Sequence, residues 1–183
     1  SGITGHHEPD IISSGLQRYP FDHALIPVNA ADTHHPRPFI PSVLPIAQTQ
    51  NVGITAMKVP AYGRLFKPGA LDGMNQALGY TLSQSGVHCA VIAAETIEQL
   101  EENVQVAQSF QILEAADLAE IEQRTATVWE DNTFFRAWFG LRSLKMDYVA
   151  QRTTHRSPLL KGFGICILLG FTRRSRGKDG GAH

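Results

Sequence analysis

Four short apolar segments, each followed by a helical pattern, constrain the fold of this chain more than any other feature. The predicted strands cover residues 2–4, 24–28, 52–57 and 89–94. The helical patterns lie near residues 9–19, 40–47, 74–83 and 97–110. Strands that alternate with helices of this length form parallel sheets with right-handed crossovers. The sequence therefore predicts an α/β fold.

The fourth strand–helix unit carries the clearest local signals. The apolar run Cys89–Ala94 predicts a buried strand, Thr96 stands where a helix N-cap is expected, and Gln99 follows three residues later as its reach-back partner. The turn between strand and helix is where α/β proteins bind anionic cofactors. Glu102 and Asn103 lie about one turn into this helix. We therefore expect a ligand site near this turn.

Composition limits the classes of protein to consider. A chain of 183 residues suits one domain or part of a larger one, and 43% hydrophobic residues are enough for a core. The net charge of −1 gives no electrostatic basis for binding nucleic acid, and two cysteines give no disulfide framework. No signal peptide is visible, and the apolar run 162–171 is too short to span a bilayer. We expect a cytoplasmic protein without membrane contact.

The two ends of the chain differ in character. A strand pattern is already under way at Ser1, so we expect a truncated chain. One more helix is predicted for residues 117–128, and an aromatic cluster follows within 129–139. This cluster is typical of core packing or of a cap over a barrel end, and the alternative is a lid over an apolar substrate pocket. We expect residues 1–139 to form the folded unit and 140–183 to form an irregular tail.

Two histidine pairs follow neighbouring predicted strands. They are His6–His7 and His34–His35, with Asp32 between them in the sequence. One histidine from each pair and Asp32 are the ligand types of a metal-dependent hydrolase, which we keep as an alternative. Adjacent histidines point apart, however, and we predict exposed loop histidines and no metal site.

Other chemical signals are individually uninformative. Lys58 ends the third predicted strand, and a buried lysine there is a Schiff-base candidate, although pairing with a carboxylate or phosphate is the commoner role. The acids Glu8, Asp32 and Glu95 show no diagnostic spacing for general acid–base work. No dinucleotide fingerprint, P-loop or nucleophile elbow occurs.

Residues 1–139 resemble the C-terminal half of the aldo-keto reductase family. The sequence Gly-Ile-Thr-Gly-His-His-Glu-Pro at 2–9 is similar to the family's fifth strand and its loop, and 52–57 is similar to strand seven. Residues 90–103 are similar to strand eight and its Glu-Gln-Leu-Glu-Glu-Asn helix, the most specific of these motifs. Residues 129–138 are similar to the family's C-terminal tail.

The resemblance implies a (β/α)8 barrel, of which this chain supplies four consecutive βα units with parallel strands, plus a C-terminal helix. The family reduces carbonyl groups with NADP(H) or NAD(H). Its Asp, Tyr, Lys and His tetrad lies on strands one to four, which would precede Ser1. The resemblance therefore implies the cofactor-binding half of an oxidoreductase with no catalytic residue of its own. Such a half would pair with a missing N-terminal half or with a second copy of itself.

The resemblance also implies where the cofactor binds. Glu102 and Asn103 would contact the adenine, Thr4 the nicotinamide carboxamide, and Met57 stands where the family places an aromatic residue on the nicotinamide. The backbone from Ala93 to Thr96 would face the adenosine phosphate. The cofactor-binding residues implied are Thr4, Asn29, Met57, Ala93, Ala94, Glu95, Thr96, Gln99, Glu102 and Asn103.

The cofactor and the chemistry both stay open at this point. The family's 2′-phosphate contacts fall at Ala93, Ala94 and Gln99, none of them cationic, which weakens the expectation of NADP. The choice between NAD and NADP, the small carbonyl substrate and the oligomeric state are not determined by the sequence. A non-catalytic half-barrel that binds a nucleotide or a partner is the main alternative function.

Overall fold

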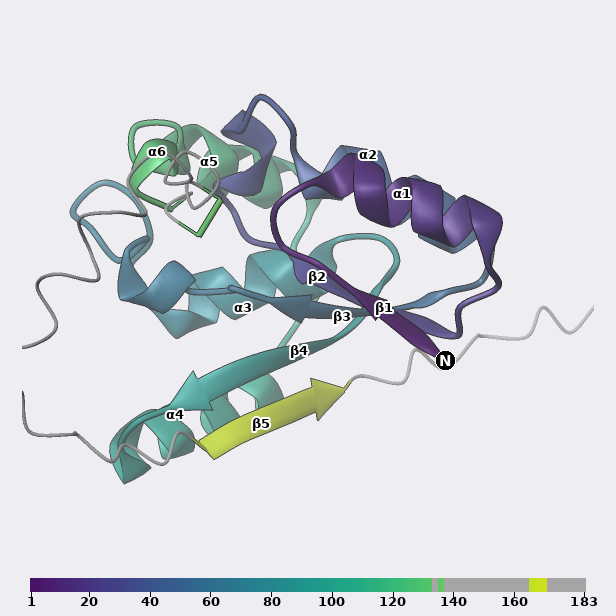
Figure 1. The fold of residues 1–183 in the computed structure, drawn as a ribbon. Helices are drawn as coiled ribbons and strands as arrows, with labels where there is room; N and C mark the ends of the chain where they lie inside the picture. The colour runs from purple at the N-terminus through teal and green to yellow at the C-terminus, as the bar shows by residue number, and fades with distance from the viewer. Residues whose placement is uncertain (133–134, 137–164, 171–183) are drawn as a thin grey trace, which may run out of the picture.

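The structure, a computed structural model, describes residues 1–132, 135–136 and 165–170 (Figure 1). One five-stranded sheet runs through it in the order β1-β2-β3-β4-β5. Strands β1 to β4 are parallel, and each pairs with the next along the chain, which confirms the predicted consecutive βα units. The strands are β1 (Gly2–Thr4), β2 (His23–Pro27), β3 (Gly53–Met57), β4 (Val87–Ala94) and β5 (Ile165–Gly170).

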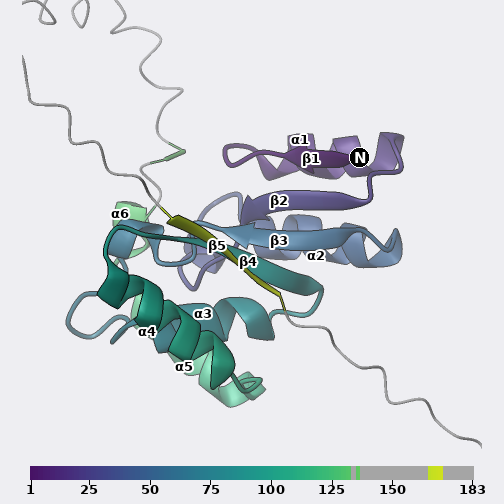
Figure 2. The ribbon, with the colours of Figure 1, turned by 90° about the horizontal axis from the view of Figure 1, so that it is seen from below.

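Helices connect the parallel strands and follow the last of them. Figures 1 and 2 show the first two on one side of the sheet. No helix of the described residues is long and apolar enough to cross a membrane. The helices are α1 (Pro9–Arg18), α2 (Phe39–Thr49), α3 (Met74–Ser83), α4 (Ile97–Gln108), α5 (Ala115–Thr125) and α6 (Trp129–Asn132), with 3-10 turns η1 (Asp32–His34) and η2 (Ala61–Gly63).

Among the described residues, helices pack against only one face of the sheet. Alternate strand residues such as Ile26, Ile54 and Ile92 are almost fully buried and belong to the core. The residues between them point to the other face, where Leu25 and Thr55 are paired neighbours and only half-buried. In a closed barrel this second face turns inward. The sheet of the described residues is not closed, so this face has no covering layer among them.

Strand β5 differs from the irregular tail expected for residues 140–183. It pairs antiparallel with β4, from Ala94 opposite Ile165 to Cys89 opposite Gly170. A free strand edge presents unpaired backbone groups, and an apolar run such as Ile165–Gly170 can satisfy them as an added strand. The other residues of that tail lie outside the described part of the chain.

Local side-chain chemistry fixes the helix starts. Pro9 stands at the first position of α1, where its missing N–H costs nothing. At α4 the Gln99 amide donates to Thr96 Oγ1 (3.2 Å), as predicted, but Gln99 Oε1 accepts from the Glu95 amide (2.8 Å) rather than from the N-cap itself. Helix α5 begins at Ala115, two residues earlier than expected, because Glu114 caps it.

The Thr96 cap predicts a measurable effect on stability. Thr96→Ala removes the acceptor for the Gln99 amide and is expected to lower the free energy of unfolding by about 1 kcal/mol. Chemical denaturation followed by circular dichroism measures this change. Thr96→Ser is the matched control and should keep most of the stability, since serine caps equally well. An alanine variant as stable as the parent would contradict the assignment of the cap.

Candidate functional site

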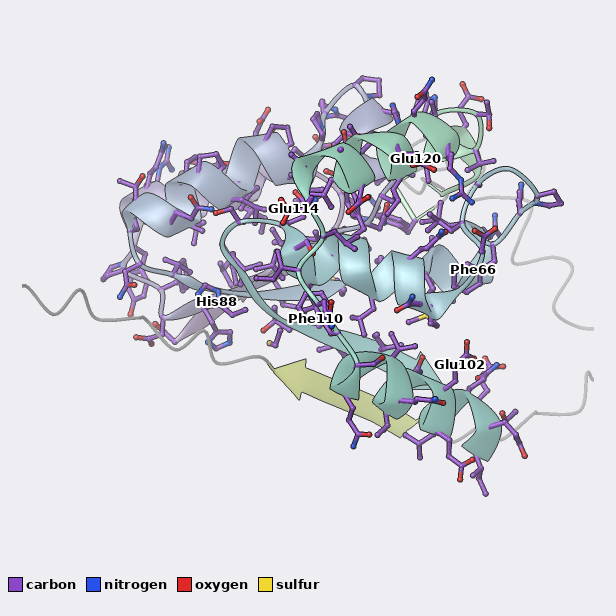
Figure 3. The ribbon with its side chains drawn as sticks, turned by 180° about the vertical axis from the view of Figure 1, so that it is seen from behind. Phe66, His88, Glu102, Phe110, Glu114 and Glu120 are labelled. Atoms are coloured by element: carbon purple, nitrogen blue, oxygen red, sulfur yellow. The ribbon has the colours of Figure 1, made fainter. Side chains whose placement is uncertain are left out.

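A cleft of about 690 Å³ opens at the carboxyl ends of β3 and β4. One wall is the loop between β3 and α3, and the other comes from the end of β4 and from α4. Figure 3 labels one residue of each wall, Phe66 on the loop and Glu102 on α4, at the same end of the molecule. Pockets of this volume accommodate cofactor-sized ligands.

Six of the ten cofactor-binding positions implied by the resemblance line this cleft. They come from the two strand ends, from the turn after β4 and from the first two turns of α4. Their convergence brings together positions nearly fifty residues apart in the sequence. The six are Met57, Ala93, Glu95, Gln99, Glu102 and Asn103.

The other four positions have structural contacts elsewhere. Thr4 Oγ1 donates to the Leu25 carbonyl (3.1 Å), and Ala94 is buried on the helix-covered face of the sheet. Thr96 caps α4. Asn29 is 1% exposed, and its side chain bonds the Lys58 carbonyl (3.1 Å) and the Ala31 amide (3.1 Å). Asn29 thus ties the loop after β2 to the end of β3.

Asn103 is the one buried residue of α4. Its exposed fraction is 3%, although helix positions that face a sheet are usually apolar. Its neighbour Glu102 is exposed at the rim of the same cleft. The wall of the cleft formed by α4 therefore carries two hydrogen-bonding groups, a buried amide and an exposed carboxylate.

The loop after β3 has an unusual backbone. Lys58 (φ 61°), Ala61 (φ 49°) and Tyr62 (φ 59°) adopt the left-handed conformation, which is costly for residues with a side chain. Lys58 Nζ donates to the Tyr62 hydroxyl (2.9 Å) and lies 4.7 Å from the centre of its ring. Tyr62 and Phe66 are exposed and line the cleft. Neither residue was predicted from the sequence to line a site. The signal that could have identified them is the pair of aromatic residues in a Gly- and Pro-rich loop after a strand.

Asp32, considered above as an acid–base or metal-binding group, forms a buried ion pair instead. Its carboxylate accepts from Arg136 Nη2 (2.7 Å) and from the Ile40 amide in the first turn of α2 (2.8 Å). The two side chains are 2% and 6% exposed. Burial raises the pKa of the Asp32 carboxyl, against the opposing effects of these two donors. The contact anchors the chain after α6 to the carboxyl end of β2.

The four histidines of the two pairs are half-buried, so the expectation of exposed loop histidines was wrong for them. His34 Nε2 lies 2.7 Å from the Glu122 carbonyl, and His35 Nδ1 lies 2.7 Å from Arg136 Nη1. Burial and the nearby His7 and Lys58 lower the pKa of His6. Among the described residues no three His, Cys, Asp or Glu side chains form a group able to hold a metal ion. The contacts of Asp32 and His34 therefore give no support to the hydrolase alternative.

Part of the aromatic cluster covers the strand ends. Phe135 is 9% exposed and meets the His6 ring edge-on at 6.0 Å. The Arg136 guanidinium lies 4.5 Å from the Phe39 ring centre, and Trp129 meets His35 edge-on at 5.8 Å. These contacts place Phe135 and Trp129 in packing roles at this end of the sheet. The remaining aromatic residues of the cluster, at 134, 138 and 139, lie outside the described residues.

Among the solved structures that match this fold are two of one enzyme. They are the holo and apo forms of aldo-keto reductase AKR11C1 from Bacillus halodurans, each with a TM-score of 0.56 and 19% sequence identity. The fold is that of part of an aldo-keto reductase barrel. The matches cover 72% of this chain and 52% or 53% of the reductase, so the chain spans about half the length of these structures. No protein-family model and no curated protein matches the sequence.

The buried ion pair predicts that two aspartates contribute very different amounts to the free energy of unfolding. Asp32→Ala leaves the buried Arg136 charge without its partner and is expected to lower the free energy of unfolding by about 3–5 kcal/mol. Asp72, whose side chain is 73% exposed, pairs with Arg124 at 3.0 Å. Asp72→Ala is the matched control and should cost at most about 1 kcal/mol. Equal losses in urea denaturation would show that Arg136 does not occupy this position.

Proposed function

We propose that this chain is the cofactor-binding half of an aldo-keto-reductase-like oxidoreductase, and that its cleft holds the adenosine end of a nicotinamide dinucleotide. The observation that carries the proposal is the convergence of Met57, Ala93, Glu95, Gln99, Glu102 and Asn103 on one cleft. In α/β proteins with parallel strands, ligands bind at the carboxyl ends of the strands, where this cleft opens.

The walls of the cleft suit the parts of such a cofactor. The exposed rings of Tyr62 and Phe66 offer flat apolar surface for an adenine. The Asn103 amide can both donate and accept hydrogen bonds at the adenine, and the exposed Glu102 carboxylate can accept hydrogen bonds from the hydroxyls of the adjoining ribose. Met57, at the end of β3, lies on the side of the cleft nearer the inward face of the sheet and would contact the nicotinamide. When bound, the nicotinamide supplies the hydride for carbonyl reduction.

The complete reaction needs groups that we assign to the other half of the barrel. Reduction of a carbonyl requires a proton donor at the carbonyl oxygen. Lys58 Nζ donates to the Tyr62 hydroxyl, and Tyr62 is 71% exposed. The Tyr62 phenol therefore lies in solvent and has no enclosed site in which to donate a proton to a bound carbonyl. We therefore propose that this chain binds and orients the cofactor, and that proton donation comes from the complementary strands.

Filling the cleft should abolish nucleotide binding. Ala93 is exposed on β4 and lines the cleft, so Ala93→Trp places an indole where the cofactor would lie. We expect the affinity for NADH, measured by isothermal titration calorimetry, to fall at least about tenfold, or ~1.4 kcal/mol. Ala119→Trp, an equally large change at an exposed position of α5, is the control. Unchanged NADH binding by Ala93→Trp would place the cofactor elsewhere.

The chain by itself should not reduce carbonyl compounds. With NADH or NADPH and a panel of aldehydes, the rate of cofactor oxidation should equal the rate without protein, because we place the proton donor on another set of strands. The absorbance of the reduced nicotinamide measures the rate. Robust turnover by the purified chain would show that a catalytic group lies within it.

A further inference from the structure

The charge around the proposed cofactor cleft is strongly one-sided. Asp72, Glu95 and Glu102 line it, and Lys58 is the one cation among the described residues that do so. The Lys58 ammonium already donates to the Tyr62 hydroxyl. The walls thus present three carboxylates where a bound nucleotide brings its own negative charge.

Other cations near the cleft do not reverse this balance. Arg124 bonds the Asp72 carboxylate at 3.0 Å and so offsets one of the three acids. Arg64 and Lys67 belong to the loop between β3 and α3 but do not line the cleft. The two carboxylates that remain are Glu95, which directly precedes the N-cap of α4, and Glu102, which lies in the second turn of this helix.

The start of α4 also has little capacity left for an anion. Helix N-termini attract phosphate through backbone N–H groups that lack partners. Here the Gln99 amide is taken by Thr96 Oγ1, and the Glu95 amide by Gln99 Oε1. Hydrogen bonds from its own backbone amide and from Thr96 lower the pKa of Glu98, so a further carboxylate stays ionised over this turn. A phosphate here would compete with three groups of the chain itself.

Resting on the proposed function, we propose that the cleft selects a dinucleotide whose adenosine ribose carries no 2′-phosphate, which means NAD(H) over NADP(H). A dianionic 2′-phosphate needs cationic partners, and Glu95 and Glu102 would repel it. The same carboxylates can accept hydrogen bonds from the two free ribose hydroxyls, the pairing used by NAD-selective sites. Glu102 is therefore the residue that we assign to cofactor selectivity.

The test compares NADH and NADPH binding to the full chain by isothermal titration calorimetry. We expect NADH to bind about tenfold tighter or more, with the ratio shrinking as salt screens the carboxylates. Glu102→Lys should raise NADPH affinity relative to NADH about tenfold or more, because it replaces repulsion of the phosphate by attraction. Glu101→Lys is the matched control, because this substitution makes the same charge change. Glu101 is the exposed neighbour of Glu102 on α4 and does not line the cleft.

Each outcome decides a different point. Equal or tighter NADPH binding by the parent chain overturns the selectivity and leaves the proposed function standing. If Glu101→Lys and Glu102→Lys shift the ratio of NADH to NADPH affinity equally, the selectivity is also overturned. The net charge of the chain, and not the cleft, would then determine that ratio. Failure of both nucleotides to bind overturns the proposed function itself, and the selectivity with it.

Discussion

Backbone hydrogen bonds between the parallel strands β1 to β4 determine where everything else in this chain lies. Because the four strands run in one direction, every strand-to-helix connection leaves from the carboxyl ends of the strands. The cleft, the Asp32–Arg136 ion pair and the Phe135 contacts all lie at these carboxyl ends. The helices pack against one face of the sheet and hold the strands in place, so a packed core and not the loops positions the strand ends.

Features encoded within a few residues could be predicted from the sequence. Helix α3 occupies the predicted residues 74–83, since a Gly- and Pro-rich loop precedes it and Gly86 follows it. The wall formed by β4 and α4 was also predictable, because an apolar run, an N-cap and a reach-back residue follow one another directly. The opposite wall was not, because residues with a side chain rarely adopt the left-handed conformation of Ala61 and Tyr62, and no glycine or asparagine marks these two positions.

The polar residues at the strand ends illustrate the limit of single-sequence reasoning. Asp32 has the chemistry of a catalytic acid or a metal ligand, and its role depends on Arg136, which lies 104 positions away. His34 similarly meets the Glu122 carbonyl, 88 positions away. No periodicity or spacing connects residues so far apart, so the sequence identified reactive side chains without showing which of them are neutralised by a partner.

The antiparallel strand β5 has a consequence for assembly. It occupies the edge of β4 along which the next parallel strand of a closed cylinder would bind, and one edge accepts one neighbour. A complementary set of strands that joins at β4 must therefore exchange places with a segment of the same polypeptide. Its apparent affinity equals the intrinsic affinity multiplied by the fraction of molecules in which that intramolecular strand is detached. Among the described residues the β1 side of the sheet carries no such competitor, so it is the side that stays open to a further parallel strand.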